Sequence, residues 1–156
     1  MSVRHWEDIE IGSRFELGSY TFTEEEIIRF GRKYDPQPFH INPQAASRSF
    51  YGGLIASGWH TVAIFMKLAV ASHASRGASE ARSGVSPGFE DLRWLRPVRP
   101  GMTLIYSSEV IEKRALASRP EWGLVLTRVE ARDADGTLVM SFTGKGFVGR
   151  KPEGET

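Results

Sequence analysis

Residues 57–71 have the sequence SGWHTVAIFMKLAVA, and this apolar stretch decides the fold. Ser57 is a favourable N-cap, so the stretch predicts a long helix that begins at this residue. Apolar side chains follow at almost every position, which leaves the helix almost no polar face. Because His60 and Lys67 interrupt the run, which is too short to span a bilayer, we expect a core helix that other elements cover on nearly every side.

The segments on either side of this helix differ in character. Before it, residues 14–22 alternate apolar and polar side chains as in a half-buried strand. A capping box at Thr23 predicts a helix over 24–34. Asn42-Pro43 then predicts the start of a short helix over about 43–50. After it, turn signals separate strands expected at 92–98, 103–112, 123–132 and 137–148. These elements predict an α+β fold in which an antiparallel sheet curls around the central helix.

The composition fits one domain and excludes several kinds of function. The 156 residues include 20 Lys and Arg against 19 Asp and Glu, and a net charge of +1 gives no field for gathering nucleic acid or an anionic membrane. The absence of Cys excludes disulfides, thiolate nucleophiles and Cys-ligated metals. The charged N-terminus lacks the apolar run of a secretory signal. We therefore expect one domain over 1–149, a loose tail over 150–156, and a cytoplasmic protein without nucleic-acid or membrane partners.

A second stretch, Asp35-Pro36-Gln37-Pro38-Phe39-His40, carries the candidate chemistry. It places a carboxylate and an imidazole five positions apart on a loop that two prolines stiffen. Pro36 disfavours helical geometry at Asp35, so the chain should leave the first helix at this residue. The start of the central helix at Ser57 and Gly58 can offer free backbone N–H groups to an anion. Together these parts predict a proton-transfer site beside an anion hole.

These residues resemble the signature of the MaoC-like dehydratases, or R-specific enoyl-CoA hydratases, a family with the hot-dog fold. The family signature is Asp-x-Asn-Pro-x-His-x-Asp-Pro, followed by a glycine-rich bend and the central helix. The corresponding segments here are DPQPFHINP at 35–43 and GGLIASG at 52–58, and LRWLRPVRPG at 92–101 looks like the strand and turn that come later in the family. The resemblance spans roughly residues 15–148 and agrees with the order of the elements expected above.

The resemblance implies a hydro-lyase that acts on a trans-2-enoyl or (R)-3-hydroxyacyl thioester of coenzyme A or an acyl carrier protein. It implies that Asp35 and His40 hold and activate one water, and that the N–H of Gly58 binds the thioester oxygen. Ser57 is expected beside the substrate as well as at the cap of the helix. The signature's Asn is replaced by Gln37 and its second Asp by Asn42, which we expect to alter substrate fit before chemistry.

The same resemblance implies no metal or redox cofactor, and it implies pairing into a homodimer or a higher even oligomer with sites at the interface. Two other functions stay open. Hot-dog thioesterases usually carry a carboxylate on or near the central helix, whereas residues 59–71 contain no Asp or Glu. A non-catalytic subunit that binds acyl thioesters is the other alternative, and the presence of both Asp35 and His40 disfavours it.

Other conspicuous side chains have ordinary structural explanations. Asp35 or His40 alone would be a common loop residue, and only their pairing at this spacing favours catalysis. No zinc-ligand spacing includes His60, which we expect at the edge of the core. Aromatic residues on strands and helices are core residues by default, and alternating charges on a strand usually face solvent. By these rules we expect Trp59, Phe89 and Trp94 in the core. We expect Arg93, Arg96 and Arg99 on the surface.

Overall fold

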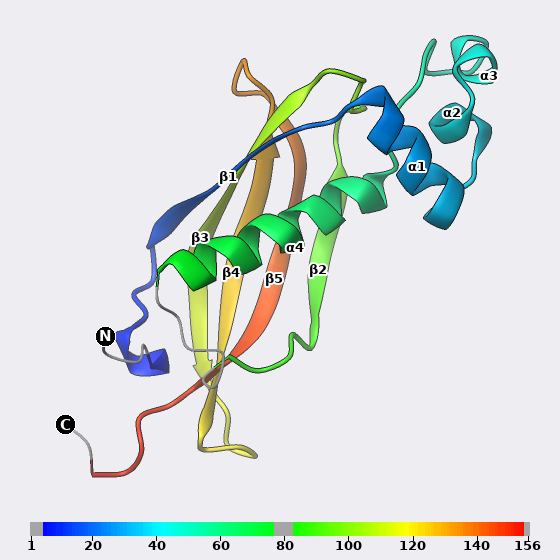
Figure 1. Ribbon diagram of the computed structural model, residues 1–156. Coiled ribbons are helices and arrows are strands. Elements are labelled where there is room, and N and C mark those ends of the chain that lie inside the picture. Colours follow the sequence, from blue (N-terminus) through cyan, green and yellow to red (C-terminus); the bar gives the residue numbers. More distant parts are fainter. Residues whose placement is uncertain (1–4, 77–82, 155–156) are drawn as a thin grey trace.

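Five antiparallel strands form one sheet in the order β1-β3-β4-β5-β2, and a computed structural model describes residues 5–76 and 83–154 of the chain (Figure 1). The strands β3, β4 and β5 follow one another through tight connections, whereas β1 and β2 occupy the two edges. Their bounds are β1 (Arg14–Thr21), β2 (Gly88–Trp94), β3 (Thr103–Ala115), β4 (Trp122–Arg132) and β5 (Leu138–Gly149).

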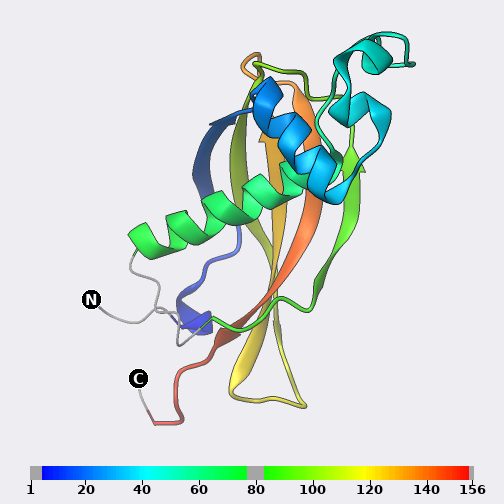
Figure 2. The ribbon, with the colours of Figure 1, turned by 45° about the vertical axis from the view of Figure 1, so that its right-hand side comes forward.

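The long helix α4 (Gly58–Ser75) lies across one face of this sheet (Figures 1 and 2). Its buried residues are His60, Thr61, Ile64 and Ala69. They join a core that includes the fully buried side chains of Leu104 and Tyr106 on β3. The α+β fold with a sheet around a central helix is therefore confirmed.

The covering of α4 is less complete than its sequence predicted. Trp59, Met66 and Val70 remain 51%, 53% and 59% exposed. At 3.6 residues per turn, positions 59, 66 and 70 fall on one side of the helix. The described part of the chain therefore covers only the sheet-facing side of α4, and an apolar stripe of these three residues faces outward.

Three short helices gather beyond the N-terminal end of α4 (Figure 2). They are α1 (Glu24–Tyr34), α2 (Pro38–Ile41) and α3 (Pro43–Ser47). Thr23 caps α1 by accepting a hydrogen bond from the N–H of Glu26, as the capping box predicted. The side chain of Asn42 caps α3 by accepting from two backbone N–H groups. The loop predicted around Pro38 contains the helical turn α2, because proline is well suited to the first position of a helix.

Two predicted bounds were wrong. The helix expected over 43–50 ends at Ser47, and the hydroxyl groups of Ser47 and Ser49 donate to carbonyls three residues earlier. The strand expected over 92–98 is β2, which begins earlier and ends at Trp94. Its pairing with β5 is irregular between Glu90 and Arg93, where Asp91 has a positive φ of 54°. This irregularity disrupts the alternation on which the sequence-based prediction relied.

Segments close to the two ends of the described chain are in contact. A 3-10 turn, η1 (Trp6–Asp8), places the carboxylate of Glu7 where it accepts from Arg150 Nε at 2.8 Å and from the Lys151 N–H at 3.0 Å. Within residues 5–76 and 83–154, none of the helices has the length and hydropathy required to cross a membrane.

Candidate active site

Asp35 and His40 are positioned by the close packing of α1 on α2. Asp35 follows the last residue of α1, and its extended φ of −150° turns the chain out of the helix before Pro36. Gly31 on α1 is buried and allows this packing, because a Cβ at that position would lie 3.0 Å from the Cβ of His40 and 2.9 Å from Cγ2 of Ile41. The glycine thus brings the residue carrying the imidazole against the helix that ends at the carboxylate.

The two side chains form a buried pair. His40 Nε2 lies 3.2 Å from Asp35 Oδ2, and the two side chains are 6% and 17% exposed. The other ring nitrogen of His40, Nδ1, lies 2.7 Å from the carbonyl oxygen of Ile55. A carbonyl only accepts hydrogen bonds, so Nδ1 carries a proton and donates to Ile55. The Ile55 carbonyl therefore directs Nε2 toward Asp35.

The carboxylate of Asp35 is held in its charged form by neighbouring donors. Gln37 Nε2 donates to Oδ1 at 2.8 Å, and Ser57 Oγ donates to Oδ2 at 2.7 Å. Burial raises the pKa of Asp35, but these two hydrogen bonds and the interaction with His40 together lower it below its ordinary value. At neutral pH the site therefore contains a carboxylate and the imidazole of His40 side by side.

Ser57 connects this pair to the start of α4. The residue is fully buried, and besides donating to Asp35 its hydroxyl oxygen accepts from the N–H of Trp59 at 3.3 Å. Gly58 is the first residue of the helix, and the N–H of a first residue has no acceptor within its own helix. The structure thus brings Asp35, Gln37, His40 and Ser57 together next to Gly58, although the chemical role of each remains a prediction.

Two features at this site had no signal in the sequence. The Ile55 carbonyl that accepts from His40 is a backbone group, and a backbone group leaves no residue signature. Trp94 was expected in the core, but its side chain is 46% exposed and its Nε1 donates to the carbonyl of Gly58 at 3.1 Å. Phe89 and Trp59, which were also expected in the core, are 47% and 51% exposed.

His60 does not join the dyad. Its ring is buried and stacks on Phe30, with ring centroids 4.6 Å apart and an angle of 5° between the planes. Burial lowers the pKa of His60, while the charge of Glu26 acts in the opposite direction to a smaller extent. Arg99 also has a structural contact, since its Nη2 donates to the carbonyl of Tyr51 at 2.5 Å.

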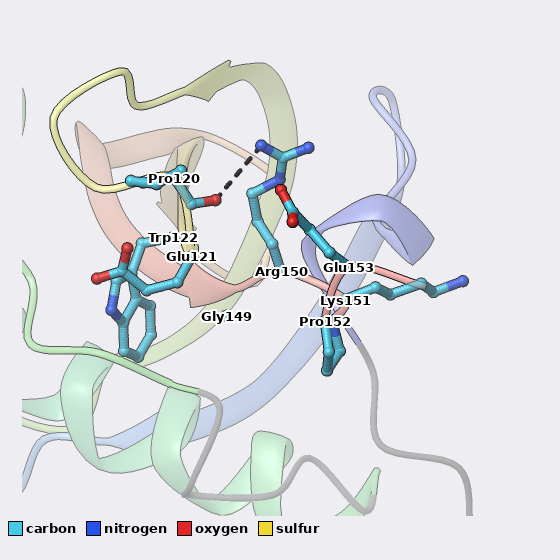
Figure 3. A pocket seen from close by; sticks show the side chains of 8 residues that line it. All are labelled: Pro120, Glu121, Trp122, Gly149, Arg150, Lys151, Pro152 and Glu153. Carbon is cyan, nitrogen blue, oxygen red and sulfur yellow. Dashed lines mark hydrogen bonds between the residues drawn. The ribbon is translucent and has the colours of Figure 1, made fainter. Parts of the chain in front are cut away.

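A cavity of about 390 Å³ lies at a different place in the fold (Figure 3). It is lined by the start of β4 and by the segment that follows β5, and Arg150 donates across it to the carbonyl of Pro120. None of the predicted site residues lines this cavity. The lining residues are Pro120, Glu121, Trp122, Gly149, Arg150, Lys151, Pro152 and Glu153.

Comparison with known proteins gives matches along most of the chain. A sequence model described as "MaoC like domain" matches residues 8–130. The uncharacterized protein YdeM of Bacillus subtilis is 29% identical over 119 residues, which are 76% of this chain and 80% of YdeM. The crystal structure of a MaoC-like dehydratase from Rhodospirillum rubrum is 33% identical, with a TM-score of 0.82 and coverage of 96% of this chain and 99% of that one.

A more distant structure identifies the fold. A Mycobacterium tuberculosis protein described as having a double hot-dog fold superposes on 99% of this chain with a TM-score of 0.76 and 16% identity. The match covers 46% of that protein, about the length of one of two hot-dog units. The hot-dog fold that the sequence resemblance implied is therefore confirmed.

Proposed function

This chain belongs to the MaoC-like domain family, and from that premise we propose that it is a hydro-lyase acting on a trans-2-enoyl or (R)-3-hydroxyacyl thioester, most favourably of coenzyme A. The observation that carries the proposal is the Asp35–His40 pair. Its two facing atoms, Asp35 Oδ2 and His40 Nε2, lie 3.2 Å apart beside the start of α4. An acyl carrier protein is the other carrier of such thioesters.

The protonation of the pair suits the binding of one water. Asp35 is a carboxylate, and Nε2 of His40 faces it because Nδ1 donates to Ile55. A single water beside the pair donates one hydrogen to the carboxylate of Asp35 while its oxygen lies next to Nε2 of His40. Its oxygen lone pair then points away from the dyad, toward the double bond of a bound enoyl group. The arrangement holds a nucleophile and a base in one place.

Hydration then has three steps that these residues support. The water oxygen bonds to Cβ of the enoyl group as the dyad takes one of its protons. The electron pair of the double bond moves onto the thioester, and the N–H of Gly58 stabilises the resulting oxygen anion. A proton from the dyad is delivered to Cα, which yields the 3-hydroxyacyl thioester. Dehydration is the same sequence in reverse.

The test is the loss of enoyl-thioester absorbance when purified protein is added to a short and a medium trans-2-enoyl-CoA. We expect turnover by the wild type and a loss of ~10²–10⁴-fold in both Asp35→Asn and His40→Ala. Asp135→Asn and His73→Ala remove the same chemical groups at exposed positions and should leave turnover unchanged. Wild-type levels of turnover in Asp35→Asn and His40→Ala would refute the assignment of the dyad.

The same assay separates the alternatives. Release of free coenzyme A without hydration would indicate a thioesterase, which the lack of Asp and Glu in α4 (Gly58–Ser75) disfavours. Binding of enoyl-CoA without either reaction would indicate a non-catalytic acyl-thioester-binding subunit.

We also propose that the chain forms a homodimer or a higher even oligomer. The outward stripe of α4 continues onto β2, because the indole rings of Trp59 and Trp94 are in contact with centroids 5.1 Å apart. Phe89 adds a half-exposed apolar side chain on the same edge strand. A second copy of the chain would cover this surface beside the start of α4, where Gly58 lies.

A further inference from the structure

We propose that Trp94 is a positioning residue that fixes the orientation of the Gly58 peptide, and this inference rests on the hydro-lyase function proposed above. Trp94 is the last residue of the edge strand β2, 36 positions after Gly58 in the chain. Its Nε1 donates to the Gly58 carbonyl at 3.1 Å. The two residues therefore join the end of a strand to the first turn of α4.

The indole ring of Trp94 also occupies the space in which a side chain at position 58 would lie. A Cβ added to Gly58 would be 2.2 Å from Cε2, 2.5 Å from Cδ2 and 2.6 Å from Nε1 of Trp94. Such distances are far inside van der Waals contact, so only glycine fits beneath this ring. Glycine, however, has the widest range of backbone conformations, and a donor carried by a glycine needs restraint from its surroundings.

Neighbouring contacts supply that restraint on both sides of the Gly58 Cα. The carbonyl of Gly58 accepts from Trp94 Nε1 and also from Thr61 Oγ1, the latter at 2.6 Å. The carbonyl of Thr61 in turn accepts from the hydroxyl of the fully buried Tyr106 at 2.9 Å. On the other side, the hydroxyl of Ser57 donates a hydrogen bond to the carboxylate of Asp35. The peptide that carries the Gly58 N–H is thus fixed between the dyad and Trp94.

The exposure of Trp94 separates this role from ordinary core packing. A side chain that is 46% exposed within one chain has much of its apolar surface outside the core of that chain, so it contributes less to the packing of the chain than a buried tryptophan does. Its hydrogen bond and its ring are instead directed at the backbone of one residue. Because oxyanion stabilisation depends on a donor oriented in advance of the reaction, loosening this residue should affect kcat more than substrate binding.

The test compares Trp94→Phe, which keeps an aromatic ring but loses the N–H, with Trp59→Phe, which alters the neighbouring indole. For turnover of trans-2-enoyl-CoA we expect Trp94→Phe to lower kcat by about ten-fold. This loss is smaller than the ~10²–10³-fold loss that removal of a whole oxyanion donor causes, because the Gly58 N–H is still present in the variant. KM should stay within about two-fold, and Tm should be close to that of the wild type. Trp59→Phe should keep kcat within about two-fold.

Equal kcat in Trp94→Phe and wild type, or an equal loss in both variants, would overturn the positioning role. Binding of acetoacetyl-CoA, measured by calorimetry, keeps this result separate from the test of the function. Unlike the enoyl substrate, this 3-oxoacyl thioester enolises readily and can place negative charge on its thioester oxygen, so its binding reports on the orientation of the Gly58 N–H. If the wild type binds it without any hydratase turnover, the proposed function fails, while weaker binding by Trp94→Phe alone still supports the positioning of Gly58. If the wild type neither turns over enoyl-CoA nor binds acetoacetyl-CoA, both proposals are overturned.

Discussion

At the scale of single residues, the hydroxyl of Ser57 has two functions that one substitution can separate. It caps α4 by accepting from the N–H of Trp59, and it donates to the carboxylate of Asp35. Loss of a serine N-cap costs roughly 0.5–2 kcal/mol of stability. Loss of the donor should raise the pKa of Asp35 toward its ordinary value, since this hydrogen bond is one of the interactions that lower it.

The Ser57→Ala variant should therefore be destabilised by a pH-dependent amount. A carboxyl whose pKa is lowered by folding stabilises the protein above its unfolded pKa, and this stabilisation is lost as the pH falls through the folded pKa. The difference in unfolding free energy between wild type and Ser57→Ala should thus be larger at pH 7 than at pH 3, as measured by urea denaturation. Ser75→Ala, at the far end of α4, is the control and should show no such pH dependence. A Ser57→Ala difference that is the same at both pH values would mean that the hydroxyl acts on the helix alone.

The sequence predicted the positions of individual site residues where a proline lies next to a polar side chain that can end or cap a helix. Pro36 ends α1 at Asp35, and Asn42-Pro43 starts α3, so the positions of Asp35 and His40 relative to the helices followed from local rules. The contacts of Trp94 and Ile55 with the site could not be predicted in this way. They depend on which strand end and which carbonyl meet across the fold, and local sequence carries no signal for either.

At the scale of elements, the packing of α1 against α2 depends on the absence of a side chain at Gly31. Within a helix, alanine is normally more stable than glycine by about 1 kcal/mol. Here the added methyl group would lie 3.0 Å from both Cβ and the carbonyl oxygen of His40. The two helices must then separate, and His40 must move relative to Asp35 and Ile55.

We expect Gly31→Ala to lose enoyl-CoA hydration by about 10²-fold, because a displacement of about 1 Å at a catalytic group has this order of effect. Overpacking should also destabilise the fold by roughly 1–3 kcal/mol, which reverses the usual benefit of alanine. The control is Gly146→Ala on β5, where an added Cβ would meet no atom within 4 Å. Full activity in Gly31→Ala would mean that the α1–α2 contact yields without moving the dyad.

The strands differ in how well the sequence predicted them, for a physical reason. β3, β4 and β5 pair with neighbours on both sides, and their predicted bounds agree with the structure to within three residues. β2 pairs only with β5, and its register is interrupted between Glu90 and Arg93. An edge strand with such an irregularity lacks a regular alternation of buried and exposed side chains. The bounds predicted for β2 from that alternation therefore differ from the observed bounds.

At the scale of the whole molecule, the surface made by α4 and β2 is more apolar than a single chain requires. Five large side chains on it are each about half exposed. They are Trp59, Met66, Val70, Phe89 and Trp94. Covering apolar surface contributes about 25 cal/mol per Å², which makes a second copy of the chain a favourable partner for this surface. The first turn of α4 lies at one end of the surface, so the partner would also limit access of water to the proposed active site.

This arrangement predicts a dimer or larger even oligomer that a single charge can disrupt. In Met66→Glu a carboxylate would replace the half-exposed thioether at the middle of the stripe, and burying that charge without a partner is costly. We expect the wild type to sediment with at least twice the chain mass, and Met66→Glu to shift toward the mass of one chain with weaker hydratase activity. Lys67→Glu is the matched control, because Lys67 lies over the ring of Tyr20 on β1, away from the stripe, and it should leave the mass unchanged. A wild-type protein that sediments as a clean monomer at all concentrations would rule out the dimer, and the proposed active site would then have to be complete within one chain.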